Sequence, residues 1–442
     1  MNRETAEPDV DNFPGENARG WVEKHHEYAA DTTYVYDFVW DASKPAEGPF
    51  CTDIDGNVLL DFTSHVASSP LGYNNPEIES RLQELGIPEP NKIAGQDFYV
   101  AVGDDIDDPE LPGPTHLMEM LVDIAPDGLD TVFLSNSGAE GVENGIKIAY
   151  DNNPEAKHAF TFQGAFHGRT LGALSLNRSK GKYRKRFPAV SGITDLPYCD
   201  GCESREGCSC GFFRGSTNAL RQKLNPDTGE MSPEEVAYII LEPIQGEGGY
   251  RVPNEDFMEK IQQASEKYDI PIISDEVQAG LGRTGEWWGS DHFAIEPDVI
   301  ASAKSLRVGA TVASEDMFPD QKGRLSSTWG AGDIISSIQG ALTIEIIQEE
   351  NLMDNAVERG KHLKQGLRDI DTQEIIDVRG RGLMVAAEFE TQKQRDNAKD
   401  RCLNHGLLTL DCGYKTLRLL PPLDVREREI DLALEILETV LG

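Results

Sequence analysis

The sequence predicts an α/β fold with a large, mostly parallel sheet and a smaller α+β unit. Two observations predict it. From about residue 114 onward, short apolar runs alternate with longer segments whose apolar residues recur at helical spacing. The chain also has 442 residues, which is more than one hydrophobic core usually serves. Strands that alternate with helices pair in parallel and are covered on both faces, so the strands themselves are apolar throughout.

The elements ahead of this alternation are short. The first 15 residues are polar and acidic, which is typical of a flexible arm. A short helix is expected at Trp21–Ala30. The segment Phe50–Phe62 is expected to form a hairpin, because two strand-like runs flank a turn that contains Gly56.

The sheet and the C-terminal unit follow in order. The expected strands of the sheet are Thr131–Leu134, Ala159–Phe162, Ala237–Leu241, Ile270–Ile273 and Val299–Ala301. The helical segments are Gly141–Asp151, Asn254–Tyr268, Ile334–Glu350 and a terminal helix from Glu427; Ile375–Glu390 and Leu407–Leu420 complete the smaller unit. We therefore expect an arm and part of the small domain at 1–64, a large domain at 65–332 and a C-terminal small domain at 333–442.

The charge of the chain is its most unusual bulk property. Asp and Glu number 77 against 41 Lys and Arg, which leaves a net charge of −36. A surface this acidic repels nucleic-acid phosphates and anionic membranes, so neither is expected as a partner. The excess indicates a halophilic source, since a salt-rich cytoplasm screens the self-repulsion. The sequence shows neither a long apolar run nor a secretion signal, which predicts a cytoplasmic protein.

Chemically capable residues follow three of the expected strands. Asp275, Lys304 and the small-residue turn Ser137–Ala139 each come at or just after a strand end, where ligand sites of such sheets gather. A buried acid there needs a cationic partner, and a desolvated lysine has a lowered pKa that suits Schiff-base chemistry. A helix N-terminus suits a phosphate. Each feature alone is more often an ordinary loop residue.

Together the three features meet the needs of one kind of cofactor. An aldehyde with a phosphate tail and a pyridine ring requires a lysine for the aldehyde and a helix N-terminus for the phosphate. It also requires an acid that keeps the ring nitrogen protonated, so that the ring can act as an electron sink. The chain supplies all three at strand ends.

These residues lie in segments that closely resemble the class III, fold-type I pyridoxal-phosphate aminotransferases. The segment Ile272–Lys304 resembles the lysine-site signature of that family. The other matching segments are Ser135–Ala149, Gly164–Thr170, Leu241–Tyr250, Ser326–Gly330 and Leu417–Leu423. The resemblance extends from about Pro14 to the C-terminus and is closest to archaeal members that act on 4-aminobutyrate, lysine or ornithine. It implies a fold-type I transferase that binds pyridoxal 5'-phosphate and forms a homodimer or higher homo-oligomer.

The resemblance also implies cofactor roles, position by position. Lys304 and Asp275 are the catalytic residues, Lys304 at the aldehyde and Asp275 at the ring nitrogen. The other implied cofactor contacts are Ser137, Gly138 and Ala139 at the phosphate, Phe166 on the ring, His167, Glu242 beside the cofactor, Gln278 at the ring oxygen, and Thr328 at the phosphate of the neighbouring subunit.

Three further residues are candidates for substrate binding. The resemblance implies that Arg418 binds the α-carboxylate of an amino or oxo acid, because a guanidinium matches a carboxylate bidentately. It implies that Glu247 masks this arginine when other substrates bind. Arg169 is a second candidate for a carboxylate. Without the resemblance, an ordinary surface ion pair is the simpler interpretation of both Arg418 and Glu247.

The implied reaction is a ping-pong, Schiff-base transfer of an amino group. The donor is an amino acid or ω-amino acid of the 4-aminobutyrate, lysine or ornithine type, and the acceptor is 2-oxoglutarate or another oxo acid. Lys304 shuttles the proton. An amino-acid racemase or epimerase with the same residues is the alternative. The stretch after Lys304 departs from the glycine-rich family pattern and adds Arg307, so the preferred donor stays open.

Four cysteines lie within 12 residues, at Cys199, Cys202, Cys208 and Cys210. Their number matches a tetrahedral zinc or an iron–sulfur site, although the spacing after Cys202 fits no standard knuckle. The alternatives are a structural metal site and a reduced, redox-prone loop.

Overall fold

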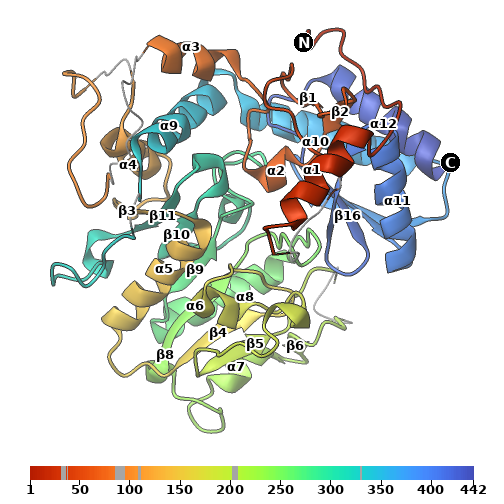
Figure 1. Cartoon of the computed structure of the whole chain (residues 1–442). Helices are drawn as coiled ribbons and strands as arrows, with labels where there is room; N and C mark the ends of the chain where they lie inside the picture. The colour runs from red at the N-terminus through yellow and green to blue at the C-terminus, as the bar shows by residue number, and fades with distance from the viewer. Residues whose placement is uncertain (31–35, 37, 85–94, 108–110, 202–207, 329–330) are drawn as a thin grey trace. The chain divides into compact units, whose positions relative to one another are not determined.

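The computed structural model describes the whole chain except residues 31–35, 37, 85–94, 108–110, 202–207 and 329–330 (Figure 1). The chain divides into two compact units. The larger unit is Glu84–Met353, and the smaller unit combines Met1–Gln83 with Asp354–Gly442. Both ends of the chain therefore belong to the smaller unit.

A seven-stranded sheet forms the centre of the larger unit. Its strands, in spatial order, are β3 (Thr131–Ser135), β11 (Gly309–Ala313), β10 (Val299–Ser302), β9 (Ile272–Asp275), β8 (Val236–Leu241), β4 (His158–Phe162) and β5 (Ile193–Leu196). All run parallel except β11, which is antiparallel to both of its neighbours. Every residue of β8, β10 and β11 is buried, as expected for strands covered on both faces. The predicted α/β fold with a mostly parallel sheet is confirmed.

Helices cover both faces of this sheet. They are α4 (Pro114–Asp123), α5 (Gly138–Asn152), α6 (Leu171–Leu176), α7 (Ala219–Lys223), α8 (Glu255–Tyr268) and α9 (Ile334–Glu349). Successive strand residues serve opposite faces: Val299 and Ala301 of β10 pack with α5 and α6, whereas Ile300 between them packs with α4 and α9. On the same side as α4 and α9, α7 and α8 cover the β4 and β8 half of the sheet, where Phe257 is central.

The smaller unit contains two further sheets. The first has the order β1 (Phe50–Thr52), β2 (Val58–Asp61), β14 (Leu407–Leu408), and the second has the order β12 (Ile375–Arg381), β13 (Met384–Phe389), β16 (Thr416–Leu419), β15 (Leu410–Cys412). The helices of this part of the chain are α1 (Glu16–His26), α2 (Ser64–Ala67), α3 (Pro76–Glu84), α10 (Leu352–Asp369), α11 (Gln392–Asn404) and α12 (Glu427–Leu441). The predicted hairpin is confirmed: β1 and β2 pair antiparallel around Gly56, whose φ is +99°. Among the described residues no helix combines the length and apolarity that crossing a bilayer requires.

The N-terminal segment differs from the prediction of a flexible arm. Arg3 is buried and donates to Glu429 Oε1 at 2.6 Å and to Asp424 Oδ2 at 2.5 Å, within the smaller unit. The backbone of Asp9 bridges to Val58 of β2. A buried guanidinium is stable where carboxylates neutralise it. The two carboxylates lie more than 400 residues from Arg3 in the sequence, so the local sequence does not indicate that this segment is ordered.

Candidate active site

Three strand ends meet at one edge of the sheet in the larger unit. Parallel pairing places Ala301 of β10 opposite Asp275 of β9, so the chain leaves both strands at the same edge. The turn before α5 lies beside them, because a Cβ added to Gly138 would come within 3.3 Å of the Cβ of Ala303. The structure therefore brings together the acid, the small-residue turn and the segment that leads into Lys304.

The turn at Ser137–Ala139 forms the N-terminus of α5. Ser137 caps the helix, since its hydroxyl accepts the N–H of Glu140 at 3.3 Å. The Glu140 carboxylate accepts the N–H of Asn136 at 2.7 Å. First-turn N–H groups lack a carbonyl partner within the helix, and the helix dipole adds positive potential. The N–H groups of Gly138 and Ala139 thus form a site suited to a phosphate.

Asp275 is held in one orientation at the end of β9. Its Oδ1 accepts the N–H of Val277 at 3.1 Å, and its Oδ2 accepts Nδ1–H of His167 at 2.8 Å. His167 is only 2% exposed, and its backbone N–H donates to Oδ1 of Asn177 at 2.6 Å. Because a carboxylate only accepts, the imidazole proton lies on Nδ1. His167 therefore fixes the orientation of the Asp275 carboxylate, whose remaining lone pairs can accept another donor.

Lys304 follows β10 in a tight and well-anchored connection. It begins the 3-10 helix η4 (Lys304–Leu306), and Arg307 then takes a left-handed φ of 60° that turns the chain back into β11. Leu306 is fully buried in the core beneath α9. A Cβ added to Gly340 of α9 would lie 2.6 Å from the Leu306 carbonyl oxygen, so the helix packs directly on this loop. The partly buried Lys304 is consequently carried on a rigid support.

Glu242 joins two loops at the end of β8. Its Oε1 accepts the N–H of Phe166 and its Oε2 accepts the N–H of Gly246, both at 2.9 Å. Burial is the main cause that raises the pKa of the Glu242 carboxyl to about 7. Tyr198 lies on the other side of this strand end and donates to the Pro243 carbonyl at 3.2 Å. Glu242 thus acts as a clamp that positions the Phe166 ring.

The loop after Glu242 presents Glu247 to a group of basic and aromatic side chains. Glu247 Oε1 accepts both the Lys180 ammonium and the Tyr183 hydroxyl at 2.8 Å. Arg169 stacks on the ring of Tyr183, with 4.0 Å between guanidinium carbon and ring centre, and lies 5.3 Å from the ring of Phe166. Burial and the Glu247 charge raise the pKa of the Tyr183 phenol, which keeps it a donor.

Glu276 follows Asp275 in sequence but serves a different purpose. Its fully buried carboxylate accepts the N–H of Gly289 at 2.8 Å, the N–H of Ser290 at 2.9 Å and the Ser274 hydroxyl at 3.1 Å. It thereby holds the 3-10 helix η3 (Gly289–His292) against the sheet edge. Burial raises the pKa of the Glu276 carboxyl to about 7, from an ordinary value of 4.5.

The pKa of Glu276 predicts a pH dependence of stability. Between about pH 4.5 and 7 the folded chain holds a proton that the unfolded chain has lost, so the stability contributed by Glu276 falls as pH rises. The Glu276→Gln variant lacks this titration. We expect its free energy of unfolding relative to wild type to rise by about 1–3 kcal/mol between roughly pH 5 and pH 7.5 in denaturant titrations. A constant difference across this range would contradict the assignment.

The remaining predicted residues lie in different places. Gln278 lies against the loop after β8, because a Cβ added to Gly246 would approach its Oε1 to 2.8 Å. Thr328 is exposed, and its carbonyl accepts Asn136 Nδ2 at 3.1 Å, next to the α5 turn. Arg418 is buried in β16 of the smaller unit.

Three of the predicted cysteines converge in the larger unit. The sulfur atoms of Cys199, Cys208 and Cys210 all lie within 4.8 Å of one another. Cys202, the fourth cysteine of the prediction, lies outside the described residues.

Several residues of this site were not expected from the sequence. They are Lys180, Tyr183, Asn177 and Glu276, each identified by a contact with a predicted residue or by its position next to one. One signal existed for Lys180 and Tyr183. Six of the 41 Lys and Arg residues of this acidic chain fall within residues 178–186. Such a local excess of positive charge indicates an anionic partner.

Comparison with known proteins identifies a family over most of the chain. The family described as Aminotransferase class-III matches residues 36–441. Acetylornithine aminotransferase from Archaeoglobus fulgidus is 31% identical over 94% of this chain and 99% of its own length. An alanine/serine racemase from Pyrococcus horikoshii is 29% identical over 97% of this chain and 91% of its own length.

A solved structure agrees with these relatives. The lysine aminotransferase from M. tuberculosis superimposes with a TM-score of 0.81 at 28% sequence identity. The superposition covers 95% of this chain and 98% of that structure. The two chains therefore share their fold over nearly their whole length.

Proposed function

Because the chain belongs to the class-III aminotransferases and is a pyridoxal-phosphate-dependent enzyme of that family, we propose that it takes the amino group from a lysine-, ornithine- or 4-aminobutyrate-type donor. The acceptor is 2-oxoglutarate or another oxo acid. The observation that carries the proposal is the convergence of Asp275, Lys304 and the Ser137–Ala139 turn at one edge of the sheet. The relatives and the solved structure named above support the class of donor.

The described residues fit pyridoxal phosphate. Asp275 is 5% exposed and is fixed by His167 on one side, so its charge suits a protonated ring nitrogen on the other. Gly138 is buried where no larger residue fits, since an added Cβ would approach the Val277 side chain to 2.6 Å. This tight packing lets backbone N–H groups approach a phosphate closely. Gly138, Ala139, Phe166, Asp275, Gln278 and Lys304 would hold the cofactor, and Ser137, His167 and Glu242 would support them.

The chemistry divides between cofactor and protein. When bound, pyridoxal phosphate supplies an aldehyde for the amine and a ring that accepts electrons. Asp275 would keep the ring nitrogen protonated. Lys304 would hold the cofactor through its aldehyde, and its Nζ would be the group that accepts and returns a proton, as general base and acid.

The substrate end of the site is proposed to recognise carboxylates. The cations of residues 178–186, together with Arg169, provide local positive charge in a chain of net charge −36. Lys180 and Tyr183 occupy the Glu247 carboxylate in this structure. The roles that the sequence resemblance implies, Arg418 for the α-carboxylate and Glu247 as its mask for donors that enter with their distal amine first, remain part of the proposal. Both the amino-acid donor and the oxo-acid acceptor carry carboxylates, and these suit the local positive charge.

A half-reaction screen tests the proposed donor. Purified protein with bound cofactor is mixed with α-amino acids, ω-amino acids or diamines, and the loss of the visible absorbance band is followed. We expect the lysine, ornithine or 4-aminobutyrate class to give the fastest loss and an oxo product that mass spectrometry identifies. Subsequent addition of 2-oxoglutarate restores the band and yields glutamate. Loss of the band only with simple α-amino acids would reject the proposed donor class.

A racemase is the second candidate, because one of the relatives bears that name. Racemisation would use the same Lys304 and Asp275 but return the proton to the opposite face of the donor carbon. Incubation with one L-amino acid and no oxo acid separates the two. Formation of the D-enantiomer without loss of the cofactor band favours the racemase.

We also propose a homodimer in which Thr328 reaches the phosphate of the neighbouring subunit. Thr328 is exposed beside the α5 turn, as a residue that serves a second chain would be. Light scattering is expected to give twice the chain mass of 48.7 kDa, or a higher even multiple.

A cytoplasmic location is proposed because the six cysteines of the described residues form no disulfide. Cell fractionation tests it.

The acidic composition supports a proposal of adaptation to high salt. At a net charge of −36, added ions screen repulsion that favours unfolding. Between about 0.1 M and 2 M KCl, the thermal unfolding midpoint is expected to rise by about 10 °C or more. Sucrose at matched osmolality is the control, because it strengthens apolar burial without screening charge. An equal rise in KCl and sucrose would reject the proposal.

A further inference from the structure

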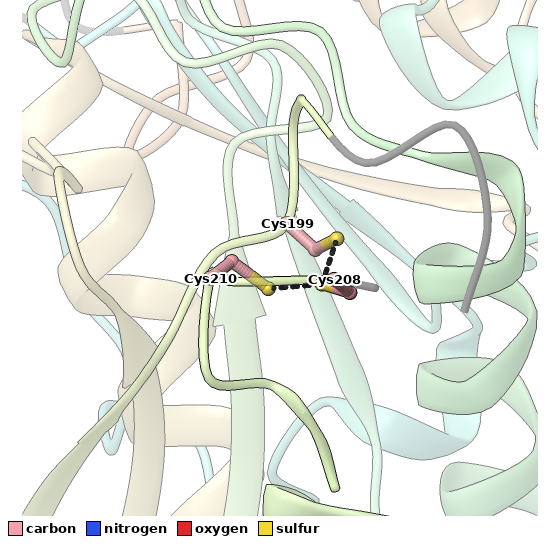
Figure 2. A group of neighbouring side chains, drawn as sticks. All are labelled: Cys199, Cys208 and Cys210. Carbon is pink, nitrogen blue, oxygen red and sulfur yellow. Dashed lines mark hydrogen bonds between the residues drawn. The ribbon is translucent and has the colours of Figure 1, made fainter. Parts of the chain in front are cut away.

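Three thiols outside the catalytic edge point toward one another. Figure 2 shows the side chains of Cys199, Cys208 and Cys210 pointing toward one another from the segments that lie after β5 and before β6. The sulfur of Cys208 is 3.5 Å from that of Cys199 and 2.9 Å from that of Cys210. Cys199 is fully buried and the other two are partly buried.

The surroundings of these thiols are those of a bound thiolate group. The backbone N–H of Phe212 donates to the Cys210 sulfur at 3.3 Å. This contact requires the intervening Gly211, whose φ of +87° turns the chain back over the sulfur. Such donors to sulfur stabilise negative charge on a ligand cysteine. Phe212 itself is buried in the core that α8 covers, so the loop is fixed on its inner side.

The three sulfurs lie close enough together to bind a single tetrahedral ion. Zinc binds thiolates at about 2.3 Å, which places two of its sulfur ligands about 3.8 Å apart. The Cys199–Cys208 separation of 3.5 Å is close to this value, and Cys210 needs a shift of about 1 Å, within side-chain rotation. An iron–sulfur cluster contains several irons and spreads its cysteines over them, whereas these three sulfurs lie within 4.8 Å of one another and can all reach one ion.

We propose that Cys199, Cys208 and Cys210 bind one zinc ion that stabilises the larger unit and takes no part in amino transfer. The three thiols lose their protons when the metal binds. The ion would tie the chain after β5 to the chain before β6 (Phe213–Arg214).

The position of the site explains what such an ion would stabilise. The Cys199 carbonyl accepts the N–H of Asn254 at 2.9 Å, directly before α8. The neighbouring Tyr198 donates to the Pro243 carbonyl at the end of β8. Zinc at Cys199 therefore anchors the loops that follow β5 and β8. Its loss should lower the unfolding midpoint while cofactor binding at Lys304 persists.

The test compares metal content and stability in matched variants. Protein is purified without chelators, under reducing conditions, and analysed by plasma mass spectrometry. We expect one zinc per chain in the wild type, at least about tenfold less in Cys208→Ser and Cys210→Ser, and an unfolding midpoint lowered by about 5 °C or more in both. Cys402→Ala, a buried cysteine of α11 in the other unit, should retain its zinc.

A cobalt titration keeps the proposal testable if a variant fails to fold. Reduced, metal-free wild-type protein is titrated with Co²⁺, and an equimolar sulfur-to-cobalt charge-transfer band with tetrahedral d–d absorption is expected. Absence of both zinc and cobalt binding would overturn the site. A Cys208–Cys210 disulfide in reduced preparations, iron in place of zinc, or full zinc content in Cys208→Ser would overturn it equally. The absorbance of the transferase cofactor, recorded separately, shows whether amino transfer persists in each case.

Discussion

Replacing Lys304 by alanine is expected to lower the turnover of amino transfer by a factor of about 10⁴ or more. Lys304 follows β10 on a loop whose Leu306 is fully buried under α9, so its amine is presented from a rigid position. Alanine removes both the attachment of the aldehyde and the group that moves the proton. Single-turnover loss of the cofactor band with the preferred donor measures the effect directly.

Two controls separate this role from a structural one. Lys322→Ala removes an exposed lysine of the same unit and should leave turnover unchanged. Borohydride treatment should attach the cofactor irreversibly to the peptide that contains Lys304 in the wild type, and to no peptide in the variant. Turnover within tenfold of wild type in Lys304→Ala, with cofactor bound, would refute the assignment of Lys304.

Five of the seven strands of the large sheet could be predicted because nearly all of their residues are buried, whereas β5, with one buried residue of four, and β11 were not predicted. The stretch VAYIIL of β8 and the stretch VIAS of β10 read as strands whatever surrounds them. The antiparallel strand β11 could not be predicted in the same way. Its residues, GATVA, are small, and it returns after only a short loop, so its direction follows from the turn at Arg307 rather than from composition. The antiparallel insertion between β3 and β10 is thus a tertiary property.

The candidate site also contains one part that could be predicted from the sequence and one part that could not. Asp275, Lys304 and the turn at Ser137–Ala139 could be predicted because the strand-end rule and the sequence resemblance both point to them. The pairings that orient the site residues could not. His167 and Asp275 are 108 residues apart, and Lys180 and Glu247 are 67 apart. No periodicity or local propensity encodes such pairings, so only the packed structure reveals which side chains fix the reactive ones.

These partners sharpen the argument for the acid. Asp275 and Glu276 are neighbouring buried acids, and the sequence assigned a role to Asp275 alone. In the structure Glu276 accepts three donors of the protein, which accounts for both of its oxygens. Among the described residues, Asp275 accepts Val277 N–H and His167 Nδ1–H, one at each oxygen, so it keeps more acceptor capacity than Glu276 does. The adjacent acids therefore offer an internal test of catalysis against stability.

Asp275→Asn is expected to lower kcat/KM by about 10³ or more while leaving the unfolding midpoint nearly unchanged. Asparagine has the same shape and its carbonyl oxygen still accepts a hydrogen bond, but it carries no charge to keep a ring nitrogen protonated. Glu276→Gln should show the opposite pattern: at about pH 5, where wild-type Glu276 is protonated, its midpoint should be lowered, and kcat/KM should stay within a few-fold of wild type, because Glu276 holds η3 and Ser274. Steady-state kinetics and thermal unfolding of the two variants, with cofactor content measured in each, complete the comparison. If Asp275→Asn with bound cofactor keeps kcat/KM within tenfold of wild type, the buried charge of Asp275 has no electrostatic role, and its pairing with His167 is purely structural.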